Sequence, residues 1–395
     1  MHGTLTPPTP PRRSQAGRLR DWLDDRRIAL IANERFRRWA ARFPFTRPMA
    51  RREARALFDL AAGFVYAQVL GACVQLGVFE TLREGPMALP ELAARLQLAP
   101  EAAQRLVTAA VGLRLLARRS GGAVALGSLG AAMIDNPGVS AMVAHHGHLY
   151  ADLADPVGLL RGVTAEGGKG GRLAGYWPYA GAEAPGALDA EAVGTYSALM
   201  AASQPMVAAE VLDAYDFTRH RCLLDVGGGE GAFLQAVAGQ APGLQLRLFD
   251  LPAVAARATA RFAAAGLAAR ATATGGDFRA DALPQGADII SLVRVAHDHD
   301  DATVLALLKA CRAALPKGAM LLLAEPMAET EGAETVGAYF AFYLLAMGQG
   351  AASRMGRPRS AAELQAMLAQ SGFARARLCA TATPLVTRVM VAEAE

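Results

Sequence analysis

The stretch Asp225-Val226-Gly227-Gly228-Gly229-Glu230-Gly231 decides the fold of this chain. It follows Cys222-Leu223-Leu224, an apolar run typical of a buried parallel strand, and it leads into Ala232–Ala238, where apolar residues recur at helical spacing. A glycine turn between a strand and a helix is the setting in which a glycine-rich motif binds a nucleotide. Glycine lets the backbone approach a ligand that a Cβ atom would push away. The alternative is a glycine-rich turn that serves packing alone.

The spacing of the glycines selects the ligand. Dinucleotide-binding folds use G-x-G-x-x-G, but after Gly229 and Gly231 the third glycine is replaced by Leu234. The run instead fits the D-x-G-x-G-x-G pattern of methyltransferases that use S-adenosylmethionine (SAM). We therefore predict SAM as the cofactor, with Asp225, Gly227, Gly229 and Gly231 at its site.

Composition favours a folded protein with two domains. The chain has 395 residues, 53% of them hydrophobic and 19% charged, which is enough for two cores. Its four cysteines are scattered without a C-x-x-C pair, which suggests reduced thiols and a cytosolic protein. The first apolar run after Met1 is broken by prolines and arginines, so we expect no signal peptide.

The net charge of +4 is distributed unevenly. Residues 1–55 hold 14 arginines and five acidic residues, a net charge of +9, which leaves −5 for the rest of the chain. Large apolar side chains are interleaved with these arginines: Trp22, Ile28, Leu30, Ile31, Phe36, Trp39, Phe43 and Phe45. This pattern suits a helix on an anionic membrane surface at least as well as a nucleic-acid contact, and an arm packed on its own domain is the other alternative.

Helical patterns fill the first part of the chain. After a proline-rich lead-in over residues 1–17, one helix is predicted from about Arg18 to Phe43, and a second from Ala54 to Leu82. The second, which contains the apolar segment Phe58–Leu70, is long enough to cross a bilayer. Polar residues interrupt it, so we expect burial in a helical domain or a dimer interface.

A winged-helix arrangement follows. Two helical patterns, Pro90–Leu96 and Pro100–Ala117, precede a small-residue hairpin at Arg118–Leu129. Such units can bind DNA, but the second helix carries only Arg105 and Arg114, so we expect dimerisation and no nucleic-acid partner. Residues 165–187 resemble an ordered loop or a linker, between helical segments near 140–162 and 189–214.

From Arg221 onward, strands and helices alternate, which predicts an α/β fold with a doubly wound parallel sheet. The predicted strands are Cys222–Val226, Leu246–Phe249, Ala271–Thr274, Asp288–Val293 and Met320–Ala324. Ligands of such sheets bind beyond the carboxyl ends of the strands. The chain thus divides into a basic arm (1–50), a helical and winged-helix-like dimerisation domain (51–165), a linker with pocket helices (166–215) and a SAM-binding catalytic domain (216–395).

Acidic residues stand at those strand ends. Asp250, followed by Leu251, ends the second strand, where a carboxylate can accept both ribose hydroxyls of a nucleoside. Asp277 follows the third strand and is expected at the adenine amino group, with Phe278 packed on the ring. Arg294, directly after the fourth strand, is also assigned to the cofactor site.

His297 is the candidate base. A histidine with a pKa near neutral can take the proton of a substrate hydroxyl, and Glu325 on the neighbouring strand can orient its ring. The alternative is a metal site, because His297, Asp298, His299 and Asp300 are all potential ligands. Adjacent residues seldom converge on one ion, so we expect no metal.

These motifs resemble the small-molecule O-methyltransferases of the plant caffeate and flavonoid type. The residues that carry the resemblance are Leu223–Gly231, Phe249–Pro252, Gly276–Phe278, His297–Asp298 and Ala324–Pro326. The likeness runs from about residue 57 to the C-terminus. It implies a class I SAM-methyltransferase fold, a homodimer and a histidine base. By position, Gly227 and Asp250 hold the methionine and ribose parts of SAM.

The same resemblance assigns Asp277 and Phe278 to the adenine, His297 to deprotonation and Glu325 to its assistance. Two departures stand out. The family's lysine four residues before the histidine is Val293 here, and its second carboxylate falls on Pro358, for which Glu363 is no clean substitute.

Within the family, the arginine-rich leader and the segment Leu57–Leu70 resemble the carotenoid 1-hydroxyl O-methyltransferases of purple bacteria. The resemblance implies a hydroxylated carotenoid as substrate and a cytoplasmic enzyme that touches an anionic membrane. The residues expected to line the substrate pocket are Met200, Phe340, Tyr343 and Met347. The alternatives are a C-methyltransferase or hydroxylase of the tetrapyrrole or polyketide type, and a SAM-sensing winged-helix regulator.

Overall fold

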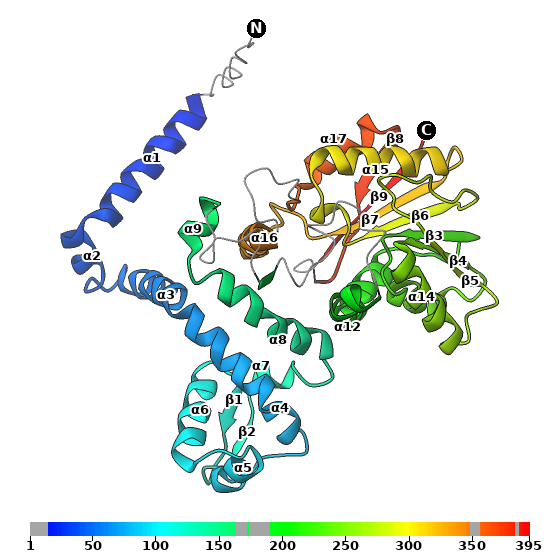
Figure 1. Cartoon of the computed structure of the whole chain (residues 1–395). Coiled ribbons are helices and arrows are strands. Elements are labelled where there is room, and N and C mark those ends of the chain that lie inside the picture. The colour runs from blue at the N-terminus through cyan, green and yellow to red at the C-terminus, as the bar shows by residue number, and fades with distance from the viewer. Residues whose placement is uncertain (1–14, 163–171, 174–189, 348–355, 384–386) are drawn as a thin grey trace. The chain divides into compact units, whose positions relative to one another are not determined.

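The computed structural model describes residues 15–162, 172–173, 190–347, 356–383 and 387–395. The chain forms two compact units, residues 1–72 and residues 73–395 (Figure 1). Most of the lead-in over residues 1–17 and most of the loop at 165–187 lie outside the described residues. The domain limits expected at residues 50, 165 and 215 remain predictions.

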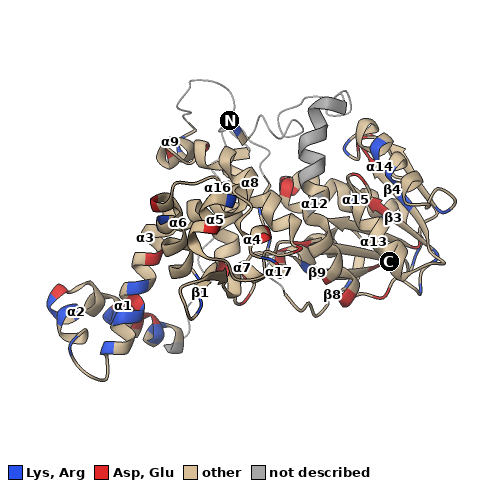
Figure 2. Ribbon diagram, turned by 90° about the horizontal axis from the view of Figure 1, so that it is seen from below, with Lys and Arg blue, Asp and Glu red and all other residues tan. Residues whose placement is uncertain are grey.

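The N-terminal unit consists of helices. They are α1 (Gln15–Ala32), α2 (Glu34–Ala40) and most of α3 (Arg47–Gln75), and blue basic residues are frequent along α1 and α2 in Figure 2. The single helix predicted through Phe43 is wrong, because Asn33 has an extended backbone and divides it. The Asn33 side chain accepts the Phe36 N–H at 3.1 Å and so caps a new helix.

Helix α3 begins earlier and ends earlier than predicted. Pro48 stands in its first turn, where a missing N–H is not needed, so the helix extends back to Arg47. At the other end Gly77 adopts a φ of +64° and separates α3 from the short α4 (Val78–Thr81). The prediction of one helix from Ala54 to Leu82 is therefore wrong at both ends.

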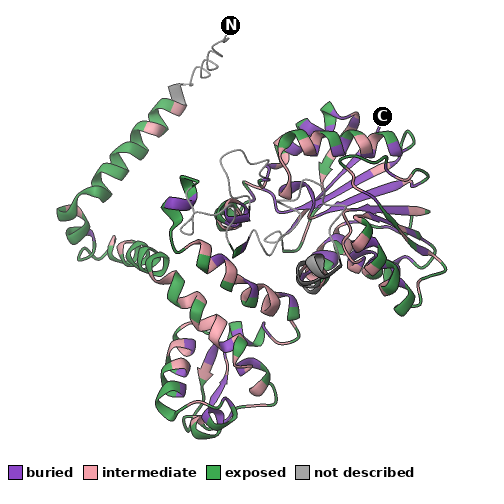
Figure 3. Cartoon of the chain, viewed as in Figure 1, coloured by how far each residue is buried: buried purple, intermediate pink, exposed green. Residues whose placement is uncertain are grey.

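The apolar part of α3 is exposed in the single chain. Leu57, Phe58 and Leu60 have 70%, 64% and 81% of their surface accessible, and this stretch is green in Figure 3. The predicted burial within the chain's own helical domain is therefore wrong here. By length and composition alone, α3 is also the one described helix that could cross a membrane. The other expectation was a dimer interface. The exposed face of α3 is available for one, because a second copy of the chain could cover it.

The winged-helix pattern is confirmed, but its second helix ends at Gly112 and not at Ala117, and its hairpin begins at Leu116 and not at Arg118. Helices α5 (Leu89–Arg95) and α6 (Pro100–Gly112) precede an antiparallel hairpin of β1 (Leu116–Arg118) and β2 (Val124–Leu126), and the short α7 (Ser128–Ala131) follows. Helix α6 ends before Arg114, whose φ is +61° and whose guanidinium donates to Ser128 Oγ. The second helix therefore carries only Arg105 as a basic residue.

Three further helices of the unit formed by residues 73–395 surround the pocket beside the sheet. They are α8 (Pro137–Asp152), α12 (Ala190–Ala214) and α16 (Glu334–Met347), with the short α9 (Pro156–Leu160) after α8. They come from distant parts of the sequence. Their facing side chains form the pocket described below.

The predicted doubly wound α/β sheet is also confirmed. Its seven strands have the order β5-β4-β3-β6-β7-β9-β8, and the first five in that order are parallel. The strands are β3 (Cys222–Val226), β4 (Gln245–Asp250), β5 (Ala271–Gly275), β6 (Ile289–Val293), β7 (Met320–Glu325), β8 (Phe373–Leu378) and β9 (Arg388–Ala394). Strand β9 runs antiparallel to β7, with Met320 opposite Glu393.

Helices cover both faces of the sheet (Figure 1). Helices α12, α13 (Ala232–Gln240) and α14 (Pro252–Ala264) pack on one face, and α15 (Asp301–Ala314) and α17 (Ala361–Gln370) on the other. Neighbouring residues of β3 show the alternation, because Leu223 packs with the first group and Leu224 with the second. The central strands β3, β6 and β7 are buried on both sides, as expected of a parallel sheet, whereas the edge strands β5 and β8 are partly exposed.

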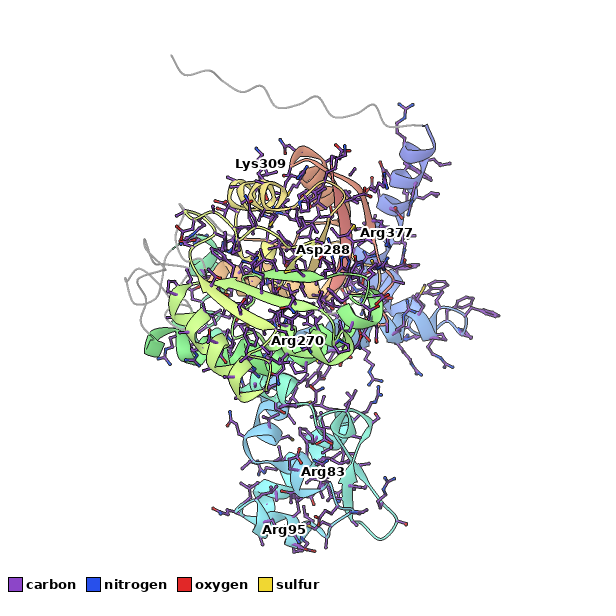
Figure 4. The ribbon with its side chains drawn as sticks, turned by 90° about the vertical axis from the view of Figure 1, so that its right-hand side faces the viewer. Arg83, Arg95, Arg270, Asp288, Lys309 and Arg377 are labelled. Carbon is purple, nitrogen blue, oxygen red and sulfur yellow. The ribbon has the colours of Figure 1, made fainter. Side chains whose placement is uncertain are left out.

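Side chains secure the amino end of the sheet and leave the carboxyl end for ligands. The Asp288 carboxylate accepts the N–H groups of Arg221 and Cys222 at the start of β3. Arg270 donates to the carbonyls of Ala238, Ala241 and Leu244 (Figure 4 labels Asp288 and Arg270). With these groups bonded inside the fold, the polar residues at the opposite strand ends are the candidates for function.

Candidate active site

The glycine turn after β3 has the left-handed backbone that only glycine adopts without strain. Gly227, Gly229 and Gly231 have φ values of +70°, +59° and +79°. A Cβ atom on Gly227 would lie 2.8 Å from Val295, whereas one on Gly229 would meet nothing within 4 Å. The space in front of Gly229 is therefore open, which fits a ligand that approaches the backbone there.

Asp250 connects the end of β4 to this turn. Its two carboxylate oxygens accept the N–H groups of Gly229 at 2.8 Å and Leu251 at 2.7 Å. Burial raises the pKa of Asp250 to about 6. Each oxygen keeps a further lone pair, so this carboxylate can still receive hydroxyl groups of a nucleoside.

Asp225 lies beneath the turn. It is fully buried, and its Oδ1 accepts the Ser291 hydroxyl at 2.6 Å. Burial raises the pKa of Asp225 to about 7. The structure therefore places Asp225 as a support for the turn, and its predicted contact with the cofactor remains a prediction.

The pair assigned to adenine has partners of its own. The Asp277 carboxylate accepts a hydrogen bond from Arg279 Nη2 at 2.8 Å. Hydrogen bonds from the side chain and the backbone N–H of Arg279 lower the pKa of Asp277. Phe278 meets the His299 ring edge-on at 5.2 Å between centroids. Arg279 was not among the predicted residues, and an adenine amino group at Asp277 would share the carboxylate with it.

Glu325 contacts the candidate base directly. Its Oε2 lies 2.7 Å from His297 Nδ1, while its Oε1 accepts the N–H groups of Val295 at 2.9 Å and Ala296 at 2.7 Å. Glu325 is 2% exposed. One carboxylate at the end of β7 thus fixes both the His297 ring and the short 3₁₀ turn η2 (Ala296–Asp298) that carries it.

A second carboxylate lies on the other side of the ring. Asp298 Oδ1 is 3.1 Å from His297 Nε2. Burial acts against a charged ring, but Asp298 and Glu325 outweigh it, so the pKa of His297 is raised above its usual 6.5. Burial also raises the pKa of Asp298 to about 6. In the sequence Asp298 was considered only as a metal ligand.

The residues near Pro358 do not supply the second carboxylate that the family resemblance places there. Glu363 accepts the Ser360 N–H in a capping box and pairs with Arg357 at 2.8 Å. Its charge is therefore used at the start of α17. Within the described part of the chain, no group of three His, Cys, Asp or Glu side chains is arranged to hold a metal ion.

A pocket opens beside the His297 ring. Its walls come from α8, α12, α16 and the end of β6, and the lining residues are Met142, Met200, Arg294, His297, Asp298, Tyr339, Phe340 and Tyr343. Met200, Phe340 and Tyr343 thus lie where they were predicted. Phe340 meets the His297 ring edge-on, with 5.5 Å between centroids.

Met347 does not line the pocket as predicted, and the cofactor contact assigned to Arg294 remains a prediction. Met347 is buried behind the pocket in a cluster with Leu149 and Leu159, and it is not among the lining residues. Arg294, assigned to the cofactor, lines the pocket and donates to Ser203 Oγ at 2.8 Å. Its second guanidinium nitrogen lies 3.0 Å from Met200 Sδ, so the side chain contacts α12 at two residues.

Sequence reasoning missed Met142 and Tyr339 as lining residues. Tyr339 is one helical turn before Tyr343, so helical spacing from a predicted lining residue was a usable signal. Met142 had no such signal, because α8 meets the pocket only through tertiary packing.

Two family models match the chain. A model described as an O-methyltransferase domain matches residues 179–374, and one described as an O-methyltransferase dimerisation domain matches residues 58–134. The second match begins on α3, at the exposed apolar stretch. The dimerisation domain supports a homodimer.

Curated relatives extend the match over nearly the whole chain. Demethylspheroidene O-methyltransferase of Cereibacter sphaeroides is 46% identical over 92% of this chain and 93% of its own. The protein of the same name from Rhodobacter capsulatus is 42% identical over 93% of this chain and 88% of its own. The resemblance predicted from the motifs is confirmed.

A solved structure shares the fold. CalO1, a methyltransferase of calicheamicin biosynthesis in a form bound to S-adenosylhomocysteine, is 28% identical with a TM-score of 0.70. The match covers 87% of this chain and 98% of CalO1.

Proposed function

The chain belongs to the O-methyltransferase family, and from that premise we propose that it transfers a methyl group from SAM to a hydroxyl of a hydroxylated carotenoid. The observation that carries the chemistry is a histidine held between two carboxylates at an apolar pocket. His297 Nδ1 lies 2.7 Å from Glu325, and its Nε2 lies 3.1 Å from Asp298.

The cofactor side fits SAM. The open space before Gly229 and the Asp250 carboxylate beside it suit the amino-acid and ribose parts of the molecule. When bound there, SAM supplies a methyl group that its sulfonium charge has already activated. The protein has to bring the acceptor oxygen into line and remove its proton.

Residues of this chain can carry out that proton transfer. An aliphatic alcohol is about as weak an acid as water, with a pKa of ~16, so it is not ionised beforehand. Glu325 accepts a hydrogen bond from Nδ1–H of His297, so the ring lone pair is on Nε2, the nitrogen that faces Asp298 and takes the hydroxyl proton. As the new C–O bond forms, that proton moves to Nε2, and Asp298 and Glu325 stabilise the resulting imidazolium.

The pocket supports an apolar acceptor. Met142, Met200 and Phe340 offer hydrocarbon, thioether and aromatic surface around the base. Two relatives that match most of the chain are named for demethylspheroidene. Together these points favour a hydroxylated polyene over a polar phenol.

Methyl transfer itself tests this proposal. Purified protein is incubated in detergent with SAM labelled on its methyl group and a hydroxylated carotenoid. We expect a methoxy carotenoid and S-adenosylhomocysteine, and no label on the same polyene without its hydroxyl. Label attached to carbon would favour C-methylation, and no transfer to any hydroxylated carotenoid would refute the substrate class.

We also propose that the N-terminal helices bind peripherally to an anionic cytoplasmic or photosynthetic membrane surface. In a helix of 3.6 residues per turn, Leu19, Trp22, Leu23 and Leu30 fall on one side of α1. Each is about half exposed or more. The basic residues Arg18, Arg20, Arg26 and Arg27 fall on or beside that side, and the acidic residues Asp21, Asp24 and Asp25 fall farther round the helix.

Aromatic residues follow on α2 and in the turns after it. Phe36, Trp39, Phe43 and Phe45 form a chain of neighbouring rings, with centroids 5.6, 4.9 and 5.7 Å apart. Aromatic rings and arginines side by side suit the boundary between lipid headgroups and acyl chains. Such a position would bring the enzyme to a substrate dissolved in the bilayer.

Matched charge variants test the membrane contact. We expect the double variant Arg26→Gln, Arg27→Gln to co-sediment less with vesicles containing anionic lipid and to depend less on salt. The control Asp24→Asn, Asp25→Asn should bind at least as well as the wild type. Equal co-sedimentation by wild type and arginine variant at low and high salt would contradict the proposal.

A further inference from the structure

Two histidine–tyrosine pairs join α8 to α16 beside the pocket. His145 Nε2 lies 2.9 Å from the Tyr343 hydroxyl, and His146 Nε2 lies 2.9 Å from the Tyr339 hydroxyl. The two tyrosines are one helical turn apart, and their rings stack with 5.6 Å between centroids at 26°. Adjacent residues of one helix therefore engage two residues on one face of the other.

The paired tyrosines belong to the pocket wall nearest the base. Tyr339 and Tyr343 both line the pocket, and Phe340 meets each of them edge-on. Phe340 also contacts the His297 ring in the same manner. The aromatic wall is thus continuous from the histidines of α8 to the catalytic histidine.

The two histidines hydrogen-bond to the tyrosine hydroxyls of that wall. A tyrosine hydroxyl in an apolar pocket needs a hydrogen-bond partner, and a substrate group would otherwise compete to be that partner. Burial lowers the pKa of His145 to about 4 and also lowers that of His146, so both rings are neutral near pH 7. A neutral imidazole can bond a hydroxyl without placing a charge next to the polyene.

We propose that His145 and His146 are specificity-determining residues. By engaging the hydroxyls of Tyr343 and Tyr339, they keep the wall beside His297 aromatic and apolar. The pocket then favours an acceptor whose hydroxyl is carried on hydrocarbon over one with further polar groups nearby. This inference rests on the proposed function, since it takes the pocket as the acceptor site.

The test compares His146→Phe, Tyr339→Phe and the double variant in the full-length protein. His146→Phe leaves the Tyr339 hydroxyl without its histidine, and we expect KM for the hydroxylated carotenoid to rise about tenfold while kcat stays within about twofold. For a small dihydroxylated phenol, kcat/KM should rise instead. In His146→Phe the Tyr339 hydroxyl keeps only its weak contact with Met142 Sδ at 3.8 Å, so adding Tyr339→Phe removes a poorly bonded hydroxyl and should recover part of the KM for the carotenoid.

His146→Gln serves as the conservative control, because its amide can still bond the tyrosine, and its KM should lie between wild type and His146→Phe. Affinity for SAM and the circular dichroism spectrum should not change in any variant. The inference would be overturned if His146→Phe had a KM for the carotenoid within twofold of wild type and an unchanged preference for the carotenoid over the phenol.

Equilibrium dialysis of the carotenoid in detergent separates the two possible failures. Wild type that binds the carotenoid without methylating it would refute the proposed function alone. Equal binding by wild type and His146→Phe would refute the specificity role, whatever the turnover.

Discussion

The cofactor side of the site and its acceptor side are built differently. On the cofactor side, Gly227, Gly229 and Asp250 come from two neighbouring strands and the turn after one of them, and main-chain conformation sets their positions. On the acceptor side, Met142 comes from α8 and Tyr339 from α16, and side-chain contacts between helices set the shape.

This difference means that the backbone of the glycine turn must be kept, whereas side chains on the acceptor side can be changed without altering the fold. Removing a side chain from the acceptor side alters its shape and polarity, whereas adding one to the glycine turn alters the backbone itself. His297 stands where the two sides meet, because β6 and β7 position it and Phe340 of α16 contacts it. The predictions below test how independent the two sides are.

Gly229→Val should have the largest effect. A Cβ atom there meets no protein atom within 4 Å, so the fold has room for it, but the side chain would fill the open space and the φ of +59° is unfavourable for a β-branched residue. We expect SAM binding below detection by calorimetry in a folded protein.

Gly318→Val is the matched control. Gly318 has a φ of +80° and likewise no atom within 4 Å of an added Cβ, but it precedes β7 at the opposite end of the sheet. It should carry a similar backbone penalty and bind SAM normally. Near-normal SAM affinity in folded Gly229→Val would show that this turn does not hold the cofactor.

His297→Ala should lower turnover by roughly 10²–10⁴-fold, the usual contribution of a positioned base. Because the cofactor side is built from other residues, SAM affinity should stay within a few-fold. Single-turnover kinetics at saturating substrate measure the chemical step. Turnover above about a third of wild type would mean that another group takes the proton.

The same division explains what could be predicted from the sequence. The strand, the glycine turn and Asp250 obey local rules of spacing, so the parallel sheet and the cofactor motif could be read directly. Glu325 could be paired with His297 because neighbouring parallel strands end at one edge.

Tertiary packing decided the rest. Met347 was assigned to the pocket for its apolar character, but the rotation of α16 turns it into the cluster behind. Asp298 was missed as a partner because its approach to Nε2 depends on the 3₁₀ turn at Ala296–Asp298, which has no clear signal in sequence. The exposure of the apolar stretch of α3 was not predicted, because an apolar helical pattern does not tell a face buried in its own domain from a face left open in the single chain.

Glu325→Gln should have a smaller effect than His297→Ala. Gln Oε1 can keep the N–H bonds from Val295 and Ala296, so the turn should survive. The amide NH₂ cannot accept the proton of Nδ1, so the ring is less firmly held in the tautomer that leaves Nε2 free. We expect turnover to fall by on the order of ten- to a hundredfold. A loss equal to that of His297→Ala would mean that orientation is as essential as the base.

Asp298→Asn should have the smallest effect, and it shows in the pH dependence. Burial acts against a charged His297 ring, but Asp298 and Glu325 together raise its pKa above 6.5. The base must be unprotonated, so kcat/KM for the acceptor should rise with pH through that raised pKa and level off above it.

Asparagine keeps the shape of Asp298 but removes one of the two negative charges that favour the imidazolium, so the pKa of His297 falls. The midpoint of the pH profile should therefore move to lower pH, while the plateau drops less than in Glu325→Gln. Steady-state kinetics from pH 5 to 10, at saturating SAM, measure both. A midpoint that stays in place or moves to higher pH would show that Asp298 does not act on the ring through its charge.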